Sequence, residues 1–432
     1  MARRWRSTRW WPSLTDPVPE VPEHQAPVAL SLDDIRDAAE AGAGIVRKTP
    51  VLTSGALSER AAAPVVLKAE NLQRTGSFKL RGALAKLAAL GEECARGVVT
   101  ASAGNHGQAL AYAARSRGVR CVVFMPEQAA ISKVEAATAL GATVHMTGVT
   151  IEESLAAARE AAESERLAFV HPFDDPVVIA GQGSLGLELV EQAPDGPLTV
   201  VVPVGGGGLA SGVAIALKSA RADVRVVGVQ VESCAPFVAS LAAGREVSVD
   251  SALTIADGVA VKRPGKVTLP LIERWIDELV VVGEDDVAEA MVFLLERAKL
   301  VVEGAGAVGV AALLAERVKP VAGGTIGVVL SGGNVDAGLL GEIVRRHESQ
   351  IGRRLVVLAR VSDRPGSLAR LLTLVAEHGA NLLDVIHIRE GFDLHVRETV
   401  VQLVLETRGQ SHAEQVKRAV REGGYSEPRV LR

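Results

Sequence analysis

The stretch LTVVVPVGGGGLASGVAIALKSARADVRVVGVQV, residues 198–231, contains the alternation that decides the fold. Two apolar runs, 198–204 and 224–231, predict buried strands, and the segment 209–221 between them predicts a helix. A strand, a crossover helix and a second strand indicate a parallel pair of strands with the helix on one face. Repeated along the chain, this order favours parallel sheets covered by helices on both faces.

The same alternation runs from about residue 30 to about residue 340. The apolar runs are short, as buried strands are, and the segments between them are rich in alanine and amphipathic, as helices are. The first helix begins at Ser31, which can cap it and precedes acidic residues in the first turn. Strands are predicted at 97–101, 121–125, 143–147 and 325–331, and helices at 31–46, 106–118, 129–141 and 150–164.

The pattern changes near residue 350, after the polar segment RRHESQIGRR. The order that follows is βαββαβ over about 80 residues, which is the ferredoxin-like split unit. Its elements are a strand at 354–361, a helix at 367–380, strands at 381–390 and 397–408, a helix at 411–424 and a strand at 425–432. We therefore predict an α/β main domain at 28–343 with a smaller subdomain inserted at about 75–175, a linker at 344–352 and a separate domain at 353–432.

Composition and charge exclude several classes of function. The chain has 432 residues, and its formal net charge of −4 provides no general basic field for nucleic acid. No run of about 18 apolar residues predicts a membrane span. Cys94, Cys121 and Cys234 are widely spaced and predict neither a disulfide framework nor a zinc site. We expect a soluble, cytoplasmic protein with a small-molecule ligand, preceded by a disordered basic tail at 1–27.

Four consecutive glycines follow the first strand of the opening stretch and precede its helix. Backbone N–H groups can approach an anion closely there, and the helix N-terminus adds partial positive charge, which favours phosphate binding over a simple tight turn. The loop lacks the Lys-Ser/Thr ending of a P-loop, which argues against a nucleoside triphosphate as the ligand. A second pattern, Gly304, Gly306 and Gly309, follows a predicted helix rather than a strand, so helix packing explains it better than dinucleotide binding.

Two more polar loops follow predicted strands, where open α/β sheets bind ligands. The loop SAGNHG, 102–107, suits a carboxylate or phenolate oxygen, although capping of a helix by Ser102 or Asn105 alone is an alternative. Ser331 ends another apolar strand before two glycines. The groups that remain as candidates for a reaction are the amine of Lys79, in GSFKLRGA, and a bound phosphate. A lysine forms a Schiff base with an aldehyde, and pyridoxal phosphate carries both an aldehyde and a phosphate.

Four blocks in this order resemble the pyridoxal-phosphate enzymes of the tryptophan-synthase-β fold, and among them the threonine and serine dehydratases. They are KAENLQRTGSFKLRGA from Lys68, SAGNHGQALA from Ser102, VGGGGLASG from Val204 and SGGNVD from Ser331. The resemblance covers about residues 30–345. It implies the two-subdomain open parallel-sheet fold of type II and pyridoxal 5'-phosphate as cofactor.

The resemblance also implies a role for each residue of the site. Lys79 matches the Schiff-base lysine that later takes the Cα proton, and Phe78 lies beside the cofactor ring. Asn105 matches the hydrogen-bond partner of the phenolic oxygen, and Ser331 matches the partner of the pyridine nitrogen. The phosphate cradle corresponds to Gly205, Gly206, Gly207, Gly208 and the amide of Leu209, and the clamp on the substrate carboxylate to Ser102, Ala103, Gly104 and His106.

The activity implied by the resemblance is L-threonine ammonia-lyase, which eliminates the β-hydroxyl of L-threonine to give 2-oxobutanoate and ammonia, with L-serine as a second substrate. The alternatives are a serine racemase or serine dehydratase and a non-catalytic amino-acid sensor. Ala103 stands where the similar serine racemases have a second serine, which disfavours racemisation. The presence together of Lys79, Asn105 and Ser331 disfavours the sensor.

Glu232 matches a glutamate that holds a divalent cation in the similar serine racemases. Pro236 and Val238 stand where an alanine and an aspartate would be, so no firm metal site follows. Glu232 stays a candidate ligand for a monovalent cation.

Residues 353–432 resemble an ACT domain, a module that pairs between subunits and binds small effectors. Asp363, Pro365 and Gly366 precede a helix whose N–H groups can meet an amino-acid carboxylate, and Asn381 begins the next strand. The resemblance implies a homodimer or homotetramer, allosteric control by isoleucine or valine, and a place in isoleucine biosynthesis. A dimerisation module without a ligand is the alternative.

Overall fold

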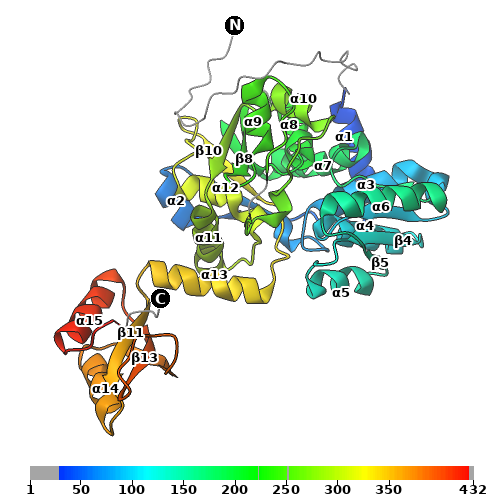
Figure 1. Ribbon diagram of the computed structural model, residues 1–432. Helices are drawn as coiled ribbons and strands as arrows, with labels where there is room; N and C mark the ends of the chain where they lie inside the picture. The colour runs from blue at the N-terminus through cyan, green and yellow to red at the C-terminus, as the bar shows by residue number, and fades with distance from the viewer. Residues whose placement is uncertain (1–28, 222, 251–252, 428–432) are drawn as a thin grey trace.

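The computed structural model describes residues 29–221, 223–250 and 253–427. The tail predicted at 1–27 lies outside these residues. The described chain forms a large body with two sheets, and helix α13 (Ala337–Gln350) leads from it to a smaller C-terminal unit with a third sheet (Figure 1). No described helix is both long and apolar enough to cross a lipid bilayer.

The larger sheet of the body has six strands in the order β1-β2-β10-β7-β8-β9. Only the edge strand β1 is antiparallel to its neighbour. Alternate residues of β7 face opposite sides, because Val200 and Val202 pack with α8 whereas Val201 packs with α12. Helices therefore cover both faces, as predicted. The strands are β1 (Val51–Thr53), β2 (Val65–Ala69), β10 (Thr325–Leu330), β7 (Leu198–Pro203), β8 (Val224–Val231) and β9 (Glu278–Val282).

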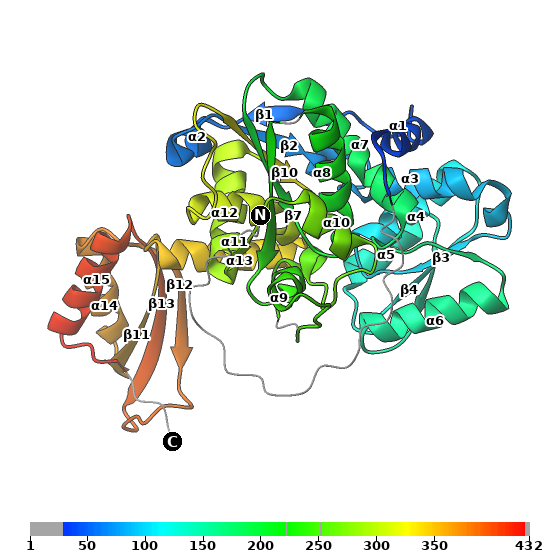
Figure 2. The ribbon, with the colours of Figure 1, turned by 90° about the horizontal axis from the view of Figure 1, so that it is seen from above.

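The smaller sheet of the body is parallel throughout, in the order β5-β4-β3-β6. Figure 2 shows it beside the larger sheet, with α6 along one side. Its strands are β3 (Val98–Ala101), β4 (Cys121–Met125), β5 (Thr143–Met146) and β6 (Ala168–Phe169). The helices of the body are α1 (Leu32–Ala41), α2 (Gly55–Ala61), α3 (Lys79–Leu90), α4 (Asn105–Ser116), α5 (Ile131–Ala139), α6 (Ile151–Ser164), α7 (Pro176–Gln192), α8 (Gly208–Ala220), α9 (Pro236–Ala243), α10 (Thr268–Trp275), α11 (Glu284–Phe293) and α12 (Gly304–Leu314).

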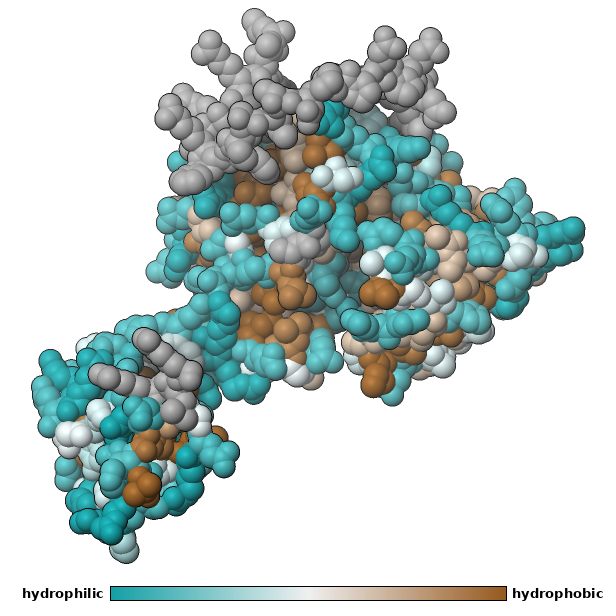
Figure 3. Space-filling view, in the orientation of Figure 1, coloured by the Kyte–Doolittle hydropathy of each residue, from teal (hydrophilic) through white to brown (hydrophobic). Residues whose placement is uncertain are grey.

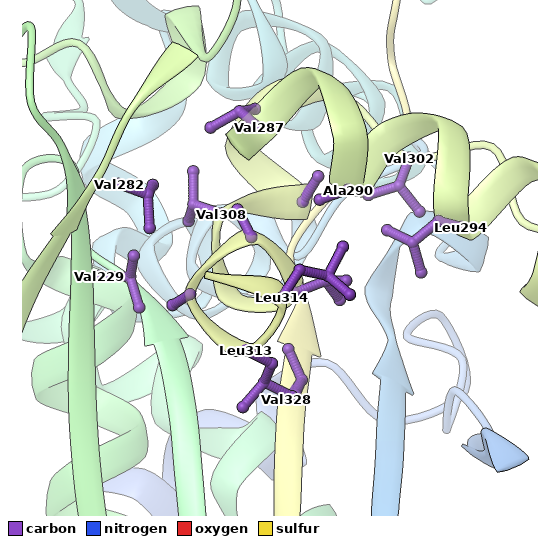
Figure 4. Close-up of a cluster of buried hydrophobic side chains, with 14 of the residues drawn as sticks. Val229, Val282, Val287, Ala290, Leu294, Val302, Val308, Leu313, Leu314 and Val328 are labelled. Atoms are coloured by element: carbon purple, nitrogen blue, oxygen red, sulfur yellow. The ribbon is translucent and has the colours of Figure 1, made fainter. Parts of the chain in front are cut away.

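Helix α12 is buried all round, between the larger sheet and α11. Figure 4 shows Val308 and Leu313 of α12 among valines of β8, β9 and β10. Its glycines allow this close packing: a Cβ on Gly306 would lie 2.5 Å from the Gly332 oxygen, and one on Gly309 would lie 2.7 Å from the side chain of Val328. Helix packing, not dinucleotide binding, therefore explains this glycine pattern.

The C-terminal unit has an antiparallel sheet in the order β11-β13-β12 with α14 and α15 packed against it. In Figure 3 it is joined to the body by a narrow neck, and the surface in view is largely hydrophilic. The ferredoxin-like fold is confirmed, although the strand predicted at 425–432 lies largely outside the described residues. The elements are β11 (Arg354–Ser362), α14 (Ser367–Glu377), β12 (Asn381–Ile388), β13 (Glu398–Glu406) and α15 (Gln410–Glu422).

Three predicted boundaries differ from the structure. The first helix is capped by Ser31 as predicted but ends at Ala41 rather than at residue 46, because Gly42 closes it and Gly44 has a φ of 76°. The helix predicted at 288–303, before the glycine pattern, begins as α11 at Glu284, continues as a π-helical turn, Leu294–Ala298, and ends there because Lys299 has a φ of 59°. Most of the segment predicted as a linker, 344–352, is the end of α13.

A buried cluster of two cations and two anions anchors the start of α3. The Arg81 guanidinium binds Glu70 through two hydrogen bonds of 2.8 Å and Glu188 through one of 2.7 Å. Lys68, fully buried on β2, pairs with the other oxygen of Glu188. Buried charges are tolerated only when they are paired, so the four side chains depend on one another. Arg81 is two residues from Lys79, and the cluster therefore fixes the turn that carries that lysine.

We predict that Arg81→Ala lowers the free energy of unfolding by about 3–5 kcal/mol, because it leaves the buried Glu70 carboxylate without its cation and removes one of the two cations paired with Glu188. Denaturant-induced unfolding measures this change. Arg36→Ala, which breaks an exposed pair with Asp33, is the matched control and is expected to change stability little. A loss for Arg81→Ala no larger than that of the control would contradict the prediction.

Candidate active site

Lys79 is the first residue of α3, and its side chain is half-buried. The amine donates a hydrogen bond of 2.7 Å to the carbonyl of Pro172, and it lies 5.2 Å from the centre of the Phe78 ring. Burial lowers the pKa of Lys79 to about 8, although the nearby Glu303 carboxylate opposes this shift. An amine that is partly neutral near pH 8 and still accessible is suited to nucleophilic attack and to proton transfer.

Backbone hydrogen bonds join the loop 76–78 to the segment 331–333 at the end of β10. The N–H of Phe78 donates to the Ser331 carbonyl at 3.1 Å, and a second bond of 2.8 Å runs back from residue 333 to residue 76. The Ser331 side chain is buried, and its hydroxyl makes one long contact of 3.4 Å with a backbone carbonyl of α12. The structure thus brings Lys79 and Ser331 together, although they are far apart in the sequence.

The four-glycine loop connects β7 to α8. Gly207 has a φ of 89°, which favours glycine, and no side chain caps the helix that follows. The Thr268 hydroxyl donates to the Gly206 carbonyl at 2.7 Å, and a Cβ on Gly206 would lie 2.2 Å from the Phe173 ring. The loop is therefore fixed and needs its glycines. N–H groups of the first turn, including that of Leu209, are the donors that a helix N-terminus offers to an anion.

The loop before α4 ends at Gly104, and no side chain caps this helix either. The Ser102 hydroxyl accepts a hydrogen bond of 3.2 Å from the Gly104 N–H, and Ala103 adds no polar group. The His106 imidazole is buried, with Nε2 3.3 Å from the Val170 carbonyl, and burial lowers its pKa to about 3. A neutral, buried imidazole presents no charge to a substrate, so the loop can offer a carboxylate mainly backbone N–H groups.

Two residues that the sequence analysis did not assign contact Asn105. Its Nδ2 donates to the Glu303 carboxylate at 2.6 Å, and its Oδ1 accepts from Asn334 Nδ2 at 2.7 Å. Burial and the nearby carboxylate of Asp257 together raise the pKa of Glu303 to about 7. Asn334 could have been found, because it is polar and follows Ser331 in the same strand-end loop. Glu303 gave no signal beyond its place before the glycine pattern of α12.

The predicted cation ligand, Glu232, directly follows β8. The N–H of Glu232 donates to the Val282 carbonyl, and the neighbouring Ser233 hydroxyl donates to Glu284 at 3.1 Å. Within residues 29–221, 223–250 and 253–427, no group of three or more His, Cys, Asp or Glu side chains could hold a metal ion. The described residues therefore supply no such partner set for Glu232.

The predicted effector residues lie at the start of α14 and β12. The Asp363 carboxylate accepts two hydrogen bonds from Arg389, of 2.6 and 3.2 Å, and this contact lowers its pKa. Gly366, after Pro365, is the N-cap of α14 with a φ of 82°. The Asn381 amide donates to Glu406 at 3.1 Å. The Asp363 and Asn381 side chains are thus engaged within the protein.

The site residues fit pyridoxal phosphate. The amine of Lys79 can bind an aldehyde, and the uncapped N-terminus of α8 can bind a phosphate. The buried hydroxyl of Ser331 has only a long contact within the protein, so it can pair with a ring nitrogen. Asn105 supplies a further amide N–H from the start of α4.

We predict that Lys79 reacts with pyridoxal phosphate about ten times faster at pH 9 than at pH 7, because an amine with a pKa near 8 loses its proton over this range. Stopped-flow absorbance of the cofactor-free protein measures the rate. The rate of α-acetyl-lysine, divided by its own fraction of neutral amine, gives the pH dependence of the reagent itself. Division of the Lys79 rate by this quantity gives the corrected amine reactivity, which should level off above about pH 9. A corrected profile with a midpoint near 10.4, the value of a solvated lysine, would contradict the prediction.

Solved structures similar to this chain share its fold. Maize serine racemase is 34% identical, with a TM-score of 0.69, and the match covers 74% of this chain and 98% of that structure. A T.th. threonine deaminase is 42% identical, with a TM-score of 0.67, and the match covers 71% of this chain and 99% of that structure. These matches confirm the predicted type II fold.

The family model for pyridoxal-phosphate dependent enzymes matches residues 43–332. An L-threonine ammonia-lyase of Thermotoga maritima is 45% identical over 397 residues, 92% of this chain and 98% of the relative. Another, of Geobacter sulfurreducens, is 45% identical over 381 residues, 88% of this chain and 94% of the relative. An alignment of 397 residues extends into the C-terminal unit. The chain therefore belongs to the pyridoxal-phosphate-dependent enzymes, and pyridoxal phosphate is its cofactor.

Proposed function

We propose that this enzyme is an L-threonine ammonia-lyase that converts L-threonine into 2-oxobutanoate and ammonia and also acts on L-serine. The observation that carries the proposal is the accessible, partly neutral amine of Lys79, on a turn whose backbone is hydrogen-bonded to the segment that carries the buried Ser331 hydroxyl. The identity of 45% to two L-threonine ammonia-lyases, over most of both chains, supports L-threonine as the substrate.

Pyridoxal phosphate, when bound, supplies an aldehyde for the amino group and a ring that withdraws electrons from Cα. Lys79 holds the cofactor, and its amine, once released, takes the Cα proton of the substrate. A pKa near 8 suits both tasks, because the amine is a nucleophile when neutral and can accept a proton. The Cα proton and the β-hydroxyl together make up one water that is lost, and one water is taken up when ammonia is released, so the overall reaction balances.

Ser331 and Ala103 favour elimination over other reactions of the same cofactor. A serine hydroxyl pairs with the pyridine nitrogen without a negative charge, so it leaves that nitrogen neutral and limits electron withdrawal by the ring. Ala103, in the loop before α4, has no group that can exchange a proton. Proton transfer then rests on Lys79 alone, which favours the lyase over a racemase despite the structural likeness to maize serine racemase.

We infer that residues 353–432 form an ACT domain that binds an amino acid, isoleucine or valine, and pairs within a homodimer or homotetramer. The βαββα order of the unit and the glycine-capped start of α14 after Asp363 and Pro365 support this proposal. Control of this kind would suit a cytoplasmic enzyme of isoleucine biosynthesis, because the reaction product would then lie upstream of the effector.

We predict that the purified enzyme releases 2-oxobutanoate and ammonia from L-threonine, and pyruvate from L-serine, as measured by mass spectrometry of the products. Lys79→Ala should lower kcat more than about a thousandfold while far-UV circular dichroism stays unchanged. Lys86→Ala removes a lysine of the same helix, paired with Asp175, and should keep activity. D-serine in place of a 2-oxo acid would instead indicate a racemase.

A rate unaffected by isoleucine and valine would contradict the effector proposal.

A further inference from the structure

A chain of side-chain hydrogen bonds surrounds Asn105, the amide at the start of α4. Asn334, beyond the end of β10, contacts it on one side, and Glu303, before α12, contacts it on the other. We propose that Asn334 and Glu303 are positioning residues that hold the Asn105 amide so that its N–H, and not its carbonyl, faces the phenolic oxygen of the cofactor. The inference rests on the proposed function, in which Asn105 binds that oxygen.

The direction of the chain follows from a backbone carbonyl. Asn334 Nδ2 lies 2.8 Å from the carbonyl of Thr75, which can only accept, so the Asn334 atom at this point is the nitrogen. The same nitrogen lies 2.7 Å from Asn105, and the Asn105 atom there must therefore be the oxygen. A longer contact of 3.4 Å with Gln108 Oε1 is also to an acceptor. The Thr75 carbonyl thus sets the orientation of both amides.

Glu303 fixes the opposite end of the Asn105 amide. Its side chain is buried, and the carboxylate accepts one N–H of Asn105 Nδ2 at 2.6 Å. The second N–H of that nitrogen has no acceptor among the side chains and carbonyls of the described ranges, which leaves it for a ligand. An amide held at both ends cannot turn over without breaking two hydrogen bonds.

Two glycines leave room for this arrangement. A Cβ on Gly76 would lie 2.2 Å from Asn334 Oδ1, and one on Gly332 would lie 2.2 Å from Glu303 Oε1. Side chains at these positions would push Asn334 and Glu303 away from Asn105. Both glycines lie in the segments that carry Lys79 and Ser331, so the backbone that positions the lysine also makes space for the clamp on Asn105.

The orientation matters because the two ends of an amide interact oppositely with an oxygen. A phenolic oxygen that carries negative charge is stabilised by an N–H donor and repelled by a carbonyl. A free asparagine could present either end. The clamp removes that choice before the cofactor binds, so less of the binding free energy is lost in ordering the side chain.

A double-mutant cycle on cofactor affinity tests the proposal. The full chain is dialysed to equilibrium against pyridoxal phosphate, and bound cofactor is read from its visible band. Asn105→Ala, Asn334→Ala and Glu303→Ala should each raise the Kd about fivefold to tenfold and displace the visible band alike. In the Asn105→Ala background, Asn334→Ala and Glu303→Ala should add less than about twofold, because the residue through which they act is gone. Asn334→Ser, a smaller change in volume, replaces Asn334→Ala if that variant does not fold.

Asn71→Ala is the matched control, since it removes a buried asparagine whose side chain bonds, within the part of the chain that the structure describes, only the Val301 carbonyl, at 3.0 Å. It should lower the unfolding temperature and leave the Kd within about twofold. The proposal is overturned if Asn334→Ala weakens binding equally with and without Asn105, or if Asn71→Ala weakens it as much. An additive cycle in a wild type that binds cofactor and forms 2-oxo acid overturns this inference alone. A wild type without a visible band overturns the proposed function as well.

Discussion

The candidate active site depends on a short backbone bridge between the loop before α3 and the end of β10. The Phe78 N–H donates to the Ser331 carbonyl at 3.1 Å, and the residue 333 N–H donates to the residue 76 carbonyl at 2.8 Å. These bonds place the amine of Lys79 and the hydroxyl of Ser331 in one fixed relation. The buried ion cluster at Arg81 holds the same turn of α3 from its other side. The reactive lysine is therefore fixed by backbone and charge contacts that take no part in the chemistry.

Both sheets of the body contribute to the site. The larger sheet carries the four-glycine loop after β7 and Ser331 after β10, and the smaller sheet carries the loop before α4 after β3. Helices α4 and α8 both have a glycine as N-cap and no side-chain cap, so their first turns offer N–H donors. In the proposed function, α8 binds the phosphate of the cofactor and α4 binds the carboxylate of the substrate. The substrate would then lie between the two sheets, with Lys79 on one side.

Much of this arrangement could be predicted from sequence, and the failures have physical reasons. The order of strands and helices follows from local apolar periodicity, and the polar and glycine-rich loops after β3, β7 and β10 mark the edge at which parallel strands end. The sequence predicts no role for Arg81, because nothing in the neighbouring residues distinguishes a buried arginine from an exposed one. The sequence does not reveal a role for Glu303, because that role depends on one contact with Asn105, which is far away in the sequence. The resemblance places His106 in the carboxylate clamp, and the structure adds that its imidazole is buried against the Val170 carbonyl, which only the packing of α4 decides.

The central claim is that Lys79 holds pyridoxal phosphate. Borohydride reduction of the holoenzyme, followed by proteolysis and mass spectrometry, tests it most directly, because reduction makes the bond between lysine and cofactor permanent. The account predicts one phosphopyridoxyl group per chain, on the peptide that contains Lys79. A modified Lys68 or Lys133 in its place, or no modified peptide from protein that shows the visible band of the cofactor, would contradict it.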